Sequence, residues 1–234
     1  MRIYAGASGF SYKPWKGPFY PADLPDGEML GYYAGRLPAV EINNTFYHMP
    51  KAATLEGWAE KTPPEFRFAL KAARQVTHFK RLKDPAEPVA YFFANTVALG
   101  PKLGPVLFQL PPNMKKDLER LEAFLAVLPD GQRAAFEFRH PSWFEEDVFA
   151  ALRTRSAALC VAETDDDDKT APPVATADWG YLRLRRAAYV DADLQRWAGW
   201  IAAQSWTEAF VFFKHEDSGM APQLAERLMA IVAC

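Results

Sequence analysis

The chain has 234 residues, of which 50% are hydrophobic and 24% are charged, and its formal net charge is −2. This composition is typical of a folded globular protein and excludes an intrinsically disordered chain. The charge balance excludes a general attraction to nucleic acid or to an anionic membrane surface, so any affinity for anions has to be local.

Cysteine usage and the first residues bear on the cellular compartment. Two cysteines, Cys160 and Cys234, occur without a CxxC pair or a Cys/His cluster. Neither a disulfide framework nor a zinc site is therefore expected. The opening stretch MRIYAGASGF lacks the pattern of a signal peptide, and no run of about 18 apolar residues is present. We expect a cytoplasmic protein that does not contact the membrane.

In the first half of the chain, short apolar runs typical of strands alternate with segments of helical periodicity. Strands are predicted at 2–8, 39–43, 66–71 and 105–110. Between them, helices are predicted around Met29 to Leu37, around Leu55 to Ala59, and over 88–99.

The second half continues the alternation. An amphipathic helix is predicted from Leu118 to Leu128, and strands are predicted at 133–139, 157–163, 181–185 and 208–214. Ser142 and Glu145 match a capping box that would open the helix after the fifth strand. Two more helices are predicted around Leu194 to Ile201 and around Leu224 to Val232.

One connection breaks the alternation, because the segment 164–179 has no helical pattern. We expect the helix between the sixth and seventh strands to be missing. Strands that alternate with helices form a parallel sheet, and eight of them predict one closed TIM-like (β/α)8 barrel over residues 1–234. An open doubly wound sheet is the alternative, but no glycine-rich phosphate loop follows any strand.

Polar residues stand at or near the end of every predicted strand. Because the carboxyl ends of barrel strands meet at one rim, we expect these side chains to form a polar pocket there. The alternative is that strands end in charges simply because they end at solvent. The residues are Ser8, Glu41, Asn43, Lys71, Gln109, Glu137, Arg139, Glu163, Arg183, Arg185, Lys214 and His215.

Cations outnumber carboxylates in this set. Three carboxylates, at Glu41, Glu137 and Glu163, face five cations, at Lys71, Arg139, Arg183, Arg185 and Lys214. Charges buried under a rim are costly unless they are paired. The excess predicts a positive pocket that suits a small ligand with a phosphate or carboxylate group.

Three of these residues are candidates for chemistry. Glu41 and Glu137 are candidate proton donors or acceptors, and the alternative is a structural ion pair with Lys71 or Arg139. Lys71 is a candidate for a Schiff base with a carbonyl substrate, although anion binding or pairing with a carboxylate is the favoured reading.

A metal and a cofactor are not expected. Glu137, Glu163 and His215 are conceivable metal ligands, but the neighbouring cations argue against a metal ion. No nicotinamide fingerprint is visible, and the run ETDDDDK at 163–169 lacks the spacing of a calcium loop, so it reads as a solvated acidic loop.

Aromatic residues follow several strands. Tyr12, Trp15, Tyr47 and Trp143 are placed where rings can stack on a ligand. The alternative for the aromatic residues is a packed lid over the barrel.

Several long motifs in order resemble one family over nearly the whole chain. They are GASGFSYKPWKGPFYP, EINNTFYHMP, FRFALKAARQVTH, GPVLFQLPPNM and FEFRHPSW. With them the chain resembles the domain-of-unknown-function 72 family, the YecE-like proteins. The resemblance implies a TIM-like barrel and no established reaction. It places the family's polar signature on Ser8, Glu41, Asn43, Thr45, Tyr47, Lys71, Gln109, Glu137, Arg139, Trp143 and Arg183.

The last third departs from that family pattern. Glu163 stands where many members have Asp, Arg185 with Arg186 where many have His-Gly, and Lys214 with His215 where many have two asparagines. These departures indicate a more cationic pocket on that side of the barrel.

The sequence favours an enzyme that binds a small anionic, sugar-like ligand at the rim and moves protons with a glutamate, as an isomerase, epimerase or hydrolase does. A non-catalytic anion-binding or sensor protein is the alternative. Nucleic-acid or nucleotide processing is a second alternative, which the net charge weakens. Carboxylates with raised pKa would favour an enzyme, and carboxylates locked in arginine pairs would favour binding.

Overall fold

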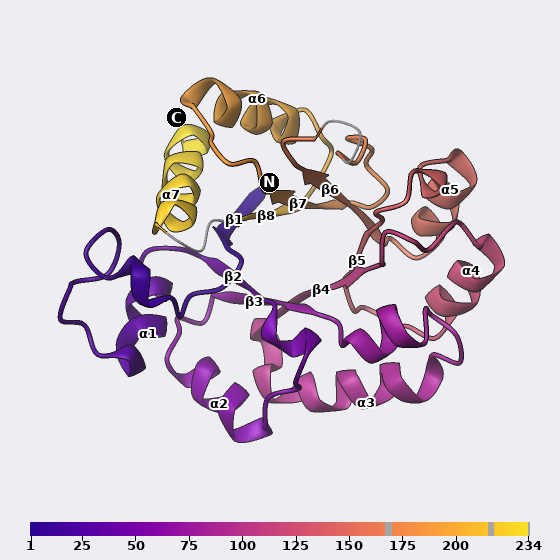
Figure 1. Ribbon diagram of the computed structural model, residues 1–234, viewed down its shortest axis with the longest axis horizontal. Coiled ribbons are helices and arrows are strands. Elements are labelled where there is room, and N and C mark those ends of the chain that lie inside the picture. The colour runs from indigo at the N-terminus through magenta and orange to yellow at the C-terminus, as the bar shows by residue number, and fades with distance from the viewer. Residues whose placement is uncertain (167–169, 215–217, 234) are drawn as a thin grey trace.

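A computed structural model describes residues 1–166, 170–214 and 218–233. Eight parallel strands close into a barrel in chain order, with β1 paired to both β2 and β8 (Figure 1). The strands are β1 (Arg2–Ala7), β2 (Ala39–Ile42), β3 (Arg67–Lys71), β4 (Leu103–Gln109), β5 (Ala134–Glu137), β6 (Ala158–Glu163), β7 (Trp179–Leu184) and β8 (Glu208–Phe213).

Helices surround the strands on the outside (Figure 1). They are α1 (Met29–Ala34), α2 (Ala52–Glu60), α3 (Ala86–Thr96), α4 (Leu118–Ala126), α5 (Glu146–Thr154), α6 (Asp191–Ala202) and α7 (Met220–Ala233). Shorter helical turns occupy Lys13–Trp15, Asp26–Glu28, Asn44–Phe46, Val97–Lys102 and Pro141–Trp143, and a π-helical turn occupies Gln75–Phe79.

The predicted barrel is confirmed, and each predicted strand is present with ends within two residues. In the described parts of the connection from β6 to β7, 164–166 and 170–178, no helix is present, as predicted. His215 and residues 167–169 of the acidic run lie outside the described residues.

The predicted capping box after β5 is wrong. Helix α5 begins at Glu146, and Ser142 lies one turn earlier, in the short helical turn Pro141–Trp143. The Ser142 hydroxyl accepts a hydrogen bond from the backbone N–H of Lys116, at 2.8 Å. That hydroxyl therefore ties the loop after β4 to the loop after β5 and does not cap a helix.

Buried residues form two layers. The larger cluster lies between the strands and the helices, and a smaller one draws on all eight strands. Because successive side chains of a strand point to opposite faces, this second set fills the barrel interior. Its members are Tyr4, Ala39, Ala69, Leu107, Ala135, Ala158, Cys160, Ala162, Trp179, Tyr181, Phe210 and Phe212.

The phase of each strand decides which polar side chains enter the barrel. Glu41 follows interior Ala39 by two residues, Glu137 follows Ala135, and Arg183 follows Tyr181. Each of the three therefore points inward, above the apolar filling and toward the carboxyl ends of the strands. We call this end of the barrel the C-terminal rim.

A tyrosine hydroxyl joins β1 to β2. Tyr33 on α1 is fully buried, and its hydroxyl accepts from the N–H of Ala7 at 2.7 Å and donates to the carbonyl of Ala39 at 2.9 Å. Gly6 leaves room for this bridge, because a Cβ there would lie 2.0 Å from the Ala39 carbonyl oxygen.

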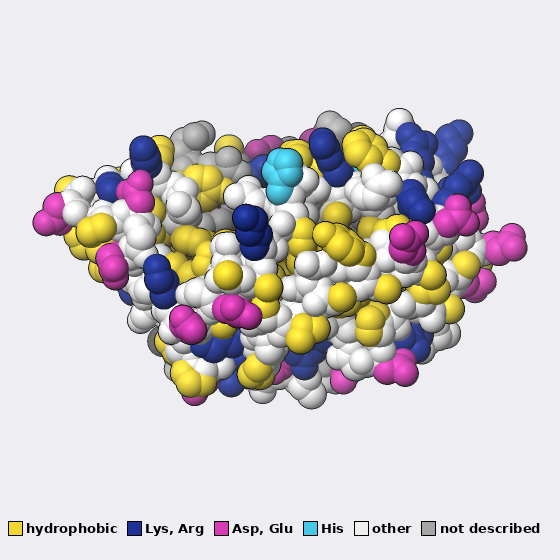
Figure 2. All heavy atoms as spheres, turned by 90° about the horizontal axis from the view of Figure 1, so that it is seen from below, with side chains coloured by type: hydrophobic (Ala, Val, Ile, Leu, Met, Phe, Trp, Pro, Cys, Tyr) yellow, Lys and Arg dark blue, Asp and Glu magenta, His cyan; other side chains and the backbone are white. Residues whose placement is uncertain are grey.

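The face over α2 and α3 carries hydrophobic side chains among charges of both signs (Figure 2). Tyr91 on α3 and Val97, in the turn that follows it, are 65% and 73% exposed. Isolated hydrophobic residues at the surface are ordinary in folded proteins.

In the described part of the chain, none of the helices has the length and apolar character needed to cross a membrane.

The Tyr33 bridge gives a prediction about stability. Tyr33→Phe leaves the N–H of Ala7 and the carbonyl of Ala39 buried without their partner, which should cost on the order of 2 kcal/mol of unfolding free energy. Urea unfolding measures the change. Tyr32→Phe on the same helix is the control, because the Tyr32 hydroxyl meets Arg36 at the surface. Equal stability of the two variants would contradict a role of the bridge in joining β1 to β2.

Candidate functional site

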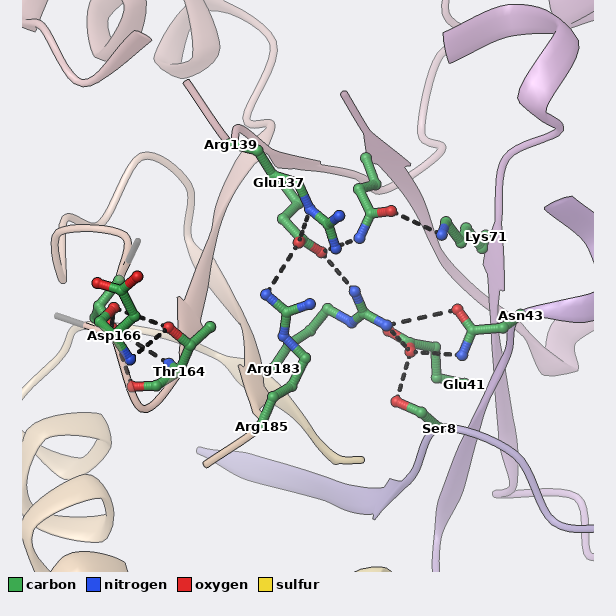
Figure 3. A network of polar contacts seen from close by, with 12 residues as sticks. Ser8, Glu41, Asn43, Lys71, Glu137, Arg139, Thr164, Asp166, Arg183 and Arg185 are labelled. Atoms are coloured by element: carbon green, nitrogen blue, oxygen red, sulfur yellow. Dashed lines mark hydrogen bonds and ion pairs between the residues drawn. The ribbon is translucent and has the colours of Figure 1, made fainter. Parts of the chain in front are cut away.

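At the C-terminal rim, one guanidinium joins two carboxylates across the barrel (Figure 3). Arg183 on β7 donates from one terminal nitrogen to Glu41 on β2, at 2.8 Å, and from the other to Glu137 on β5, at 2.6 Å. Glu41 and Glu137 have no exposed surface, and Arg183 is 3% exposed. We call these three residues, the residues that hydrogen-bond or ion-pair with them, and Lys71, which bonds to one of those partners, the rim network.

Glu41 is surrounded by donors. Its Oε1 accepts from the hydroxyl of Ser8 at 2.7 Å, from the amide of Asn43 at 3.1 Å and from Arg183. Its Oε2 accepts from the hydroxyl of Tyr181 at 2.7 Å. An ionised carboxylate offers about four lone-pair sites, so four donors occupy the acceptor capacity of Glu41.

Glu137 is enclosed in the same way. Its Oε2 accepts from the amide of Gln109 at 2.9 Å and from Arg183. Its Oε1 accepts from Nε of Arg139 at 3.1 Å and faces a terminal nitrogen of Arg185 at 3.4 Å. The register that places Gln109 opposite Glu137 on neighbouring strands fixes the first of these contacts.

The surroundings keep both carboxylates ionised. Burial by itself would raise the pKa of Glu137, but Arg183, Arg185 and Arg139 outweigh it and hold that pKa below its ordinary value. The pKa of Glu41 is likewise lowered, because Arg183, Ser8 and Tyr181 outweigh the effect of burial. In both cases the opposite charge and the hydrogen bonds to the charged form prevail over desolvation.

Lys71 is the cation of the rim network with the weakest pairing. Its Nζ donates to Oε1 of Gln109 at 2.8 Å and lies 4.1 Å from the centre of the Phe46 ring. Among the described residues, no carboxylate lies within ion-pair distance of this nitrogen. Burial, reinforced by the charge of Arg183, lowers the pKa of Lys71 from 10.5 to about 8.

Cations exceed carboxylates in the rim network. Two carboxylates, Glu41 and Glu137, are balanced against Lys71 and the three arginines at 139, 183 and 185. In the described structure, the buried Nε atoms of Arg183 and Arg185 lack a hydrogen-bond partner. The network therefore has positive charge and donor capacity that no described acceptor takes up.

The loop after β3 adds a histidine near Lys71. The ring of His78, in the π-helical turn Gln75–Phe79, packs edge-on against Phe46 with ring centres 4.8 Å apart. Burial and the nearby charges of Lys71 and Arg139 lower the pKa of His78 from 6.5. Single π-helical turns are frequent at functional sites.

Thr45 fixes the backbone under this part of the rim. Its hydroxyl lies 3.0 Å from the carbonyl oxygen of Ile42 and 2.6 Å from that of Lys71. The contact ties the turn after β2 to the end of β3. The family resemblance indicated Thr45, and the structure gives it this anchoring position.

The structure brings together nine of the predicted site residues and places a tenth beside them. The nine are Ser8, Glu41, Asn43, Lys71, Gln109, Glu137, Arg139, Arg183 and Arg185. Tyr12 lies next to them, because its hydroxyl donates to the carbonyl of Ser8 at 2.9 Å.

Other predicted site residues lie elsewhere. Trp15 is 1% exposed and packs against Tyr12, Phe19 and Tyr20, which fits the packed-lid alternative. Trp143 is fully buried, stacks on Phe138 and donates to the carbonyl of Met114.

Tyr47 and Lys214 are exposed side chains. Tyr47 is 58% exposed, and the guanidinium of Arg74 lies 5.7 Å from the centre of its ring. Lys214 follows β8, and its backbone N–H donates to the carbonyl of Leu184. Among the described residues, Tyr47 has no hydrogen bond or ion pair with the rim network.

Glu163 points away from the barrel interior. Its carboxylate pairs with Arg196 at 2.7 Å and accepts from the indole of Trp197 at 3.0 Å, both on α6. Ala162 is opposite Arg183 in the sheet and faces inward, so the next residue faces outward. The strand phase, visible as Cys160 and Ala162, was a signal that could have separated Glu163 from the inward set.

The described part of the acidic run also lies apart from the rim network (Figure 3). The Thr164 hydroxyl donates to the carbonyl of Asp166, and the Asp165 carboxylate accepts from the N–H of Ala187.

Glu137 points into the barrel and Glu163 points out of it, so the two carboxylates lie on opposite faces of the barrel wall. This arrangement removes the alternative of a metal site that contains both of them. Among the described residues, no group of three His, Cys, Asp or Glu is placed to hold a metal ion.

Sequence reasoning missed Tyr181 as a member of the site. The Tyr181 hydroxyl is fully buried and donates a hydrogen bond to the Glu41 carboxylate. Burial raises the pKa of Tyr181, and the negative charge of Glu41 raises it further. Tyr181 stands two residues before Arg183 on the same strand and so has the same phase. That spacing was the available signal.

Comparison with known proteins gives the family. A profile described as "Protein of unknown function DUF72" matches residues 4–234. The UPF0759 protein YunF of Bacillus subtilis (strain 168) is 32% identical over 159 residues, which are 63% of this chain and 54% of YunF. The match thus spans about half the length of that curated relative.

Solved structures agree with the fold. A DUF72 family protein from Thermotoga maritima MSB8 superposes with a TM-score of 0.85 at 27% identity, over 100% of both chains. A DUF72 family protein from Enterococcus faecalis V583 gives a TM-score of 0.76 at 18% identity, over 100% of this chain and 98% of that one. The resemblance predicted from the five motifs is confirmed.

The pairing of Glu137 predicts how stability depends on pH. Because its folded-state pKa lies below the ordinary 4.5, the ionised carboxylate stabilises the fold fully above that pH, and the contribution is lost as pH falls further. Glu137→Gln should lower the unfolding free energy at pH 7 by about 3 kcal/mol and should flatten its fall below about pH 5.

Urea unfolding from pH 7 down to pH 3 measures both effects. Glu122→Gln on α4 is the control, because Glu122 is exposed. Parallel loss of stability in Glu137→Gln and wild type below pH 5 would show that the ion pairs of Glu137 do not stabilise the fold.

Proposed function

The chain belongs to the DUF72 family of proteins of unknown function, and we propose that it binds a small anionic ligand at the C-terminal rim of its barrel. Arg139 and Arg185 are the groups that hold the anion in this proposal, and Lys71 lies in the same network. Glu41, Glu137 and Arg183 form the rigid base beneath them.

The observation that carries the proposal is the unbalanced charge of the rim network. Four cations share two carboxylates, and two buried guanidinium nitrogens have no described partner. Buried charge without compensation is costly, and a bound phosphate or carboxylate supplies both the missing charge and the missing acceptors. Arg139 and Arg185 keep 35% and 18% of their side chains exposed, so a ligand can reach them.

The same geometry assigns the glutamates a structural part. Glu41 already accepts from four donors, Glu137 accepts from three and is paired with Arg185 as well, and both carboxylates have a lowered pKa. A general base near neutral pH needs a free lone pair and a raised pKa, because proton transfer is most efficient when the pKa lies near the working pH. Proton transfer by Glu41 or Glu137 is therefore not part of the proposal.

A cleft beside the network suits the uncharged part of a ligand. It measures about 440 Å³, and its lining includes Ser8 and Asn43, which both contact Glu41. Tyr12, Asn44 and Trp58 also line it. Aromatic rings beside amide groups are a common surface for a polyhydroxylated compound, so we propose a sugar-like ligand with one anionic group.

The proposal predicts selective stabilisation by anions. Inorganic phosphate, 3-phosphoglycerate and gluconate are the probes in a thermal-shift experiment, and glycerol is the uncharged comparison. A ligand at about a hundred times its Kd stabilises by about 2.7 kcal/mol, which raises Tm by a few degrees. Arg139→Gln and Arg185→Gln should each weaken binding at least tenfold, by the loss of a charged hydrogen bond.

Arg153→Gln is the matched control, because Arg153 pairs only with Glu146 on the outer face of α5 among the described residues. This variant should bind the anions as the wild type does. Binding that survives both rim substitutions, or no shift with any anion, would rule the proposal out.

A further inference from the structure

We propose that Lys71 is a nucleophile that forms an imine with an aldehyde or ketone carrying an anionic group. The inference rests on the proposed function, since Arg139 and Arg185 would hold the anionic group of the same compound. It goes further by naming the reactive atom, Nζ of Lys71, and the reacting group, a carbonyl carbon.

The surroundings of Nζ differ from those of the other cations at the rim. Arg139, Arg183 and Arg185 each contact Glu137, whereas Lys71 contacts the neutral amide of Gln109 and the face of the Phe46 ring. In the described residues the Lys71 nitrogen has one hydrogen-bond acceptor, although an ammonium group has three donors. The site therefore gives the ammonium form an amide oxygen and a ring face, but among the described residues no carboxylate within ion-pair distance and no second acceptor.

Burial and nearby charges together set the pKa of Lys71. Burial is the main cause that lowers the pKa of Lys71 to about 8; the like charges of Arg183 and Arg139 add to it, and the charges of Glu137 and Glu41 oppose it. At pH 8 about half of the amine is then neutral, compared with less than about 1% of a lysine with an ordinary pKa of 10.4. A desolvated lysine next to another cationic group is a recognised form of activated amine nucleophile.

The chemistry balances without an oxidant or a further reactant. The lone pair of neutral Nζ attacks the carbonyl carbon, and a proton moves from nitrogen to oxygen to give a carbinolamine. The C–O bond then breaks, the oxygen leaves as water with one added proton, and a protonated imine remains. The net change is amine plus carbonyl plus one proton, giving iminium and water.

His78 is placed to exchange the protons of these steps. Its ring and Nζ of Lys71 both contact Phe46, with the ring centres 4.8 Å apart and Nζ 4.1 Å from the centre of the Phe46 ring. The Nδ1 atom of His78 lies 2.9 Å from the hydroxyl of Thr77, which orients the ring. A half-buried imidazole at this position accepts a proton from the carbinolamine nitrogen and returns one to the leaving hydroxyl.

The arginines restrict the class of carbonyl compound. In this proposal, a compound whose anionic group lies between Arg139 and Arg185 extends its carbonyl carbon to Lys71, which Figure 3 shows set apart from both arginines. 2-Oxo acids and short phosphorylated aldehydes are the two classes of compound that we test. A neutral aldehyde lacks the group that the arginines hold, so it should react more slowly at Lys71.

Reductive trapping tests the inference. The full chain is incubated with pyruvate, glyoxylate or D-glyceraldehyde 3-phosphate and sodium cyanoborohydride, which reduces an iminium to a stable secondary amine. Peptide mass spectrometry locates the adduct, and the other lysines serve as internal controls. We expect modification of Lys71 at pH 7.5 at least ten times faster than that of any other lysine, with a rate that levels off above about pH 8 because the neutral fraction saturates.

Variants separate the contributions. Lys71→Arg keeps the charge but cannot form an imine, so the fast adduct should disappear while the protein stays folded. Lys51→Arg, at an exposed lysine before α2, should leave the adduct unchanged. Arg139→Gln should slow trapping of pyruvate at least tenfold and leave trapping of neutral glycolaldehyde within twofold, which a purely structural role of Arg139 would not produce.

The outcomes distinguish this inference from the proposed function. Stabilisation by phosphate that depends on Arg139, together with no selective adduct at Lys71, would overturn the imine and leave the anion site standing. A selective adduct that forms equally fast with glycolaldehyde and pyruvate would overturn the assigned carbonyl class. Modification spread evenly over the lysines, with no response to anions, would overturn both.

Discussion

The position of one guanidinium between two buried carboxylates organises the top of this barrel. Arg183 reaches Glu41 on one side and Glu137 on the other, and all three side chains are almost without contact with solvent. Removing one partner would leave uncompensated charge in a poorly polarisable interior, at a cost of several kcal/mol. The surrounding hydroxyls and amides are placed where they satisfy the remaining lone pairs. The pairing therefore fixes the relative positions of three strands that are far apart in the sequence.

As a consequence, the carboxylates of the rim network and the cations at its edge have different roles. The two carboxylates are surrounded by donors and have lowered pKa values, so the function that we propose assigns them no proton transfer near neutral pH. The excess positive charge then falls on groups at the edge of the network. Arg139 and Arg185 retain exposed surface, where we propose that an anion binds, and Lys71 has an amide and an aromatic ring as its partners. The group that we propose to react is the cation that the network leaves without a described carboxylate.

The same reasoning explains which of the predicted residues lie together. Residues two apart on one strand share a face, so Glu41 with Asn43, Glu137 with Arg139, and Arg183 with Arg185 were predicted as inward pairs and are found together. Glu163 was grouped with them only because it ends a strand. Cys160 and Ala162 point into the barrel, so Glu163, the next residue, points outward and pairs with Arg196. Trp15 and Trp143 follow strands, as a ligand-stacking residue would, but neighbouring rings bury them. The position of a residue along its strand predicted that it lies at the C-terminal rim. The alternation of side chains along the strand decided whether it points into the barrel or out of it.

The sequence by itself determined the eight strands, the lack of a helix in the described part of the connection from β6 to β7, the family and the rim at which polar residues gather. Each of these follows from local periodicity or from contiguous motifs. Only the tertiary structure decided which charges meet. Arg183 lies 46 residues from Glu137 and 142 from Glu41, and their contact depends on the closure and stagger of the whole barrel. The same closure brings Tyr181 to Glu41 and leaves Lys71 without a described carboxylate. Pairing across a barrel is a matter of three-dimensional distance, and distance of this kind is not encoded in any short stretch of the chain.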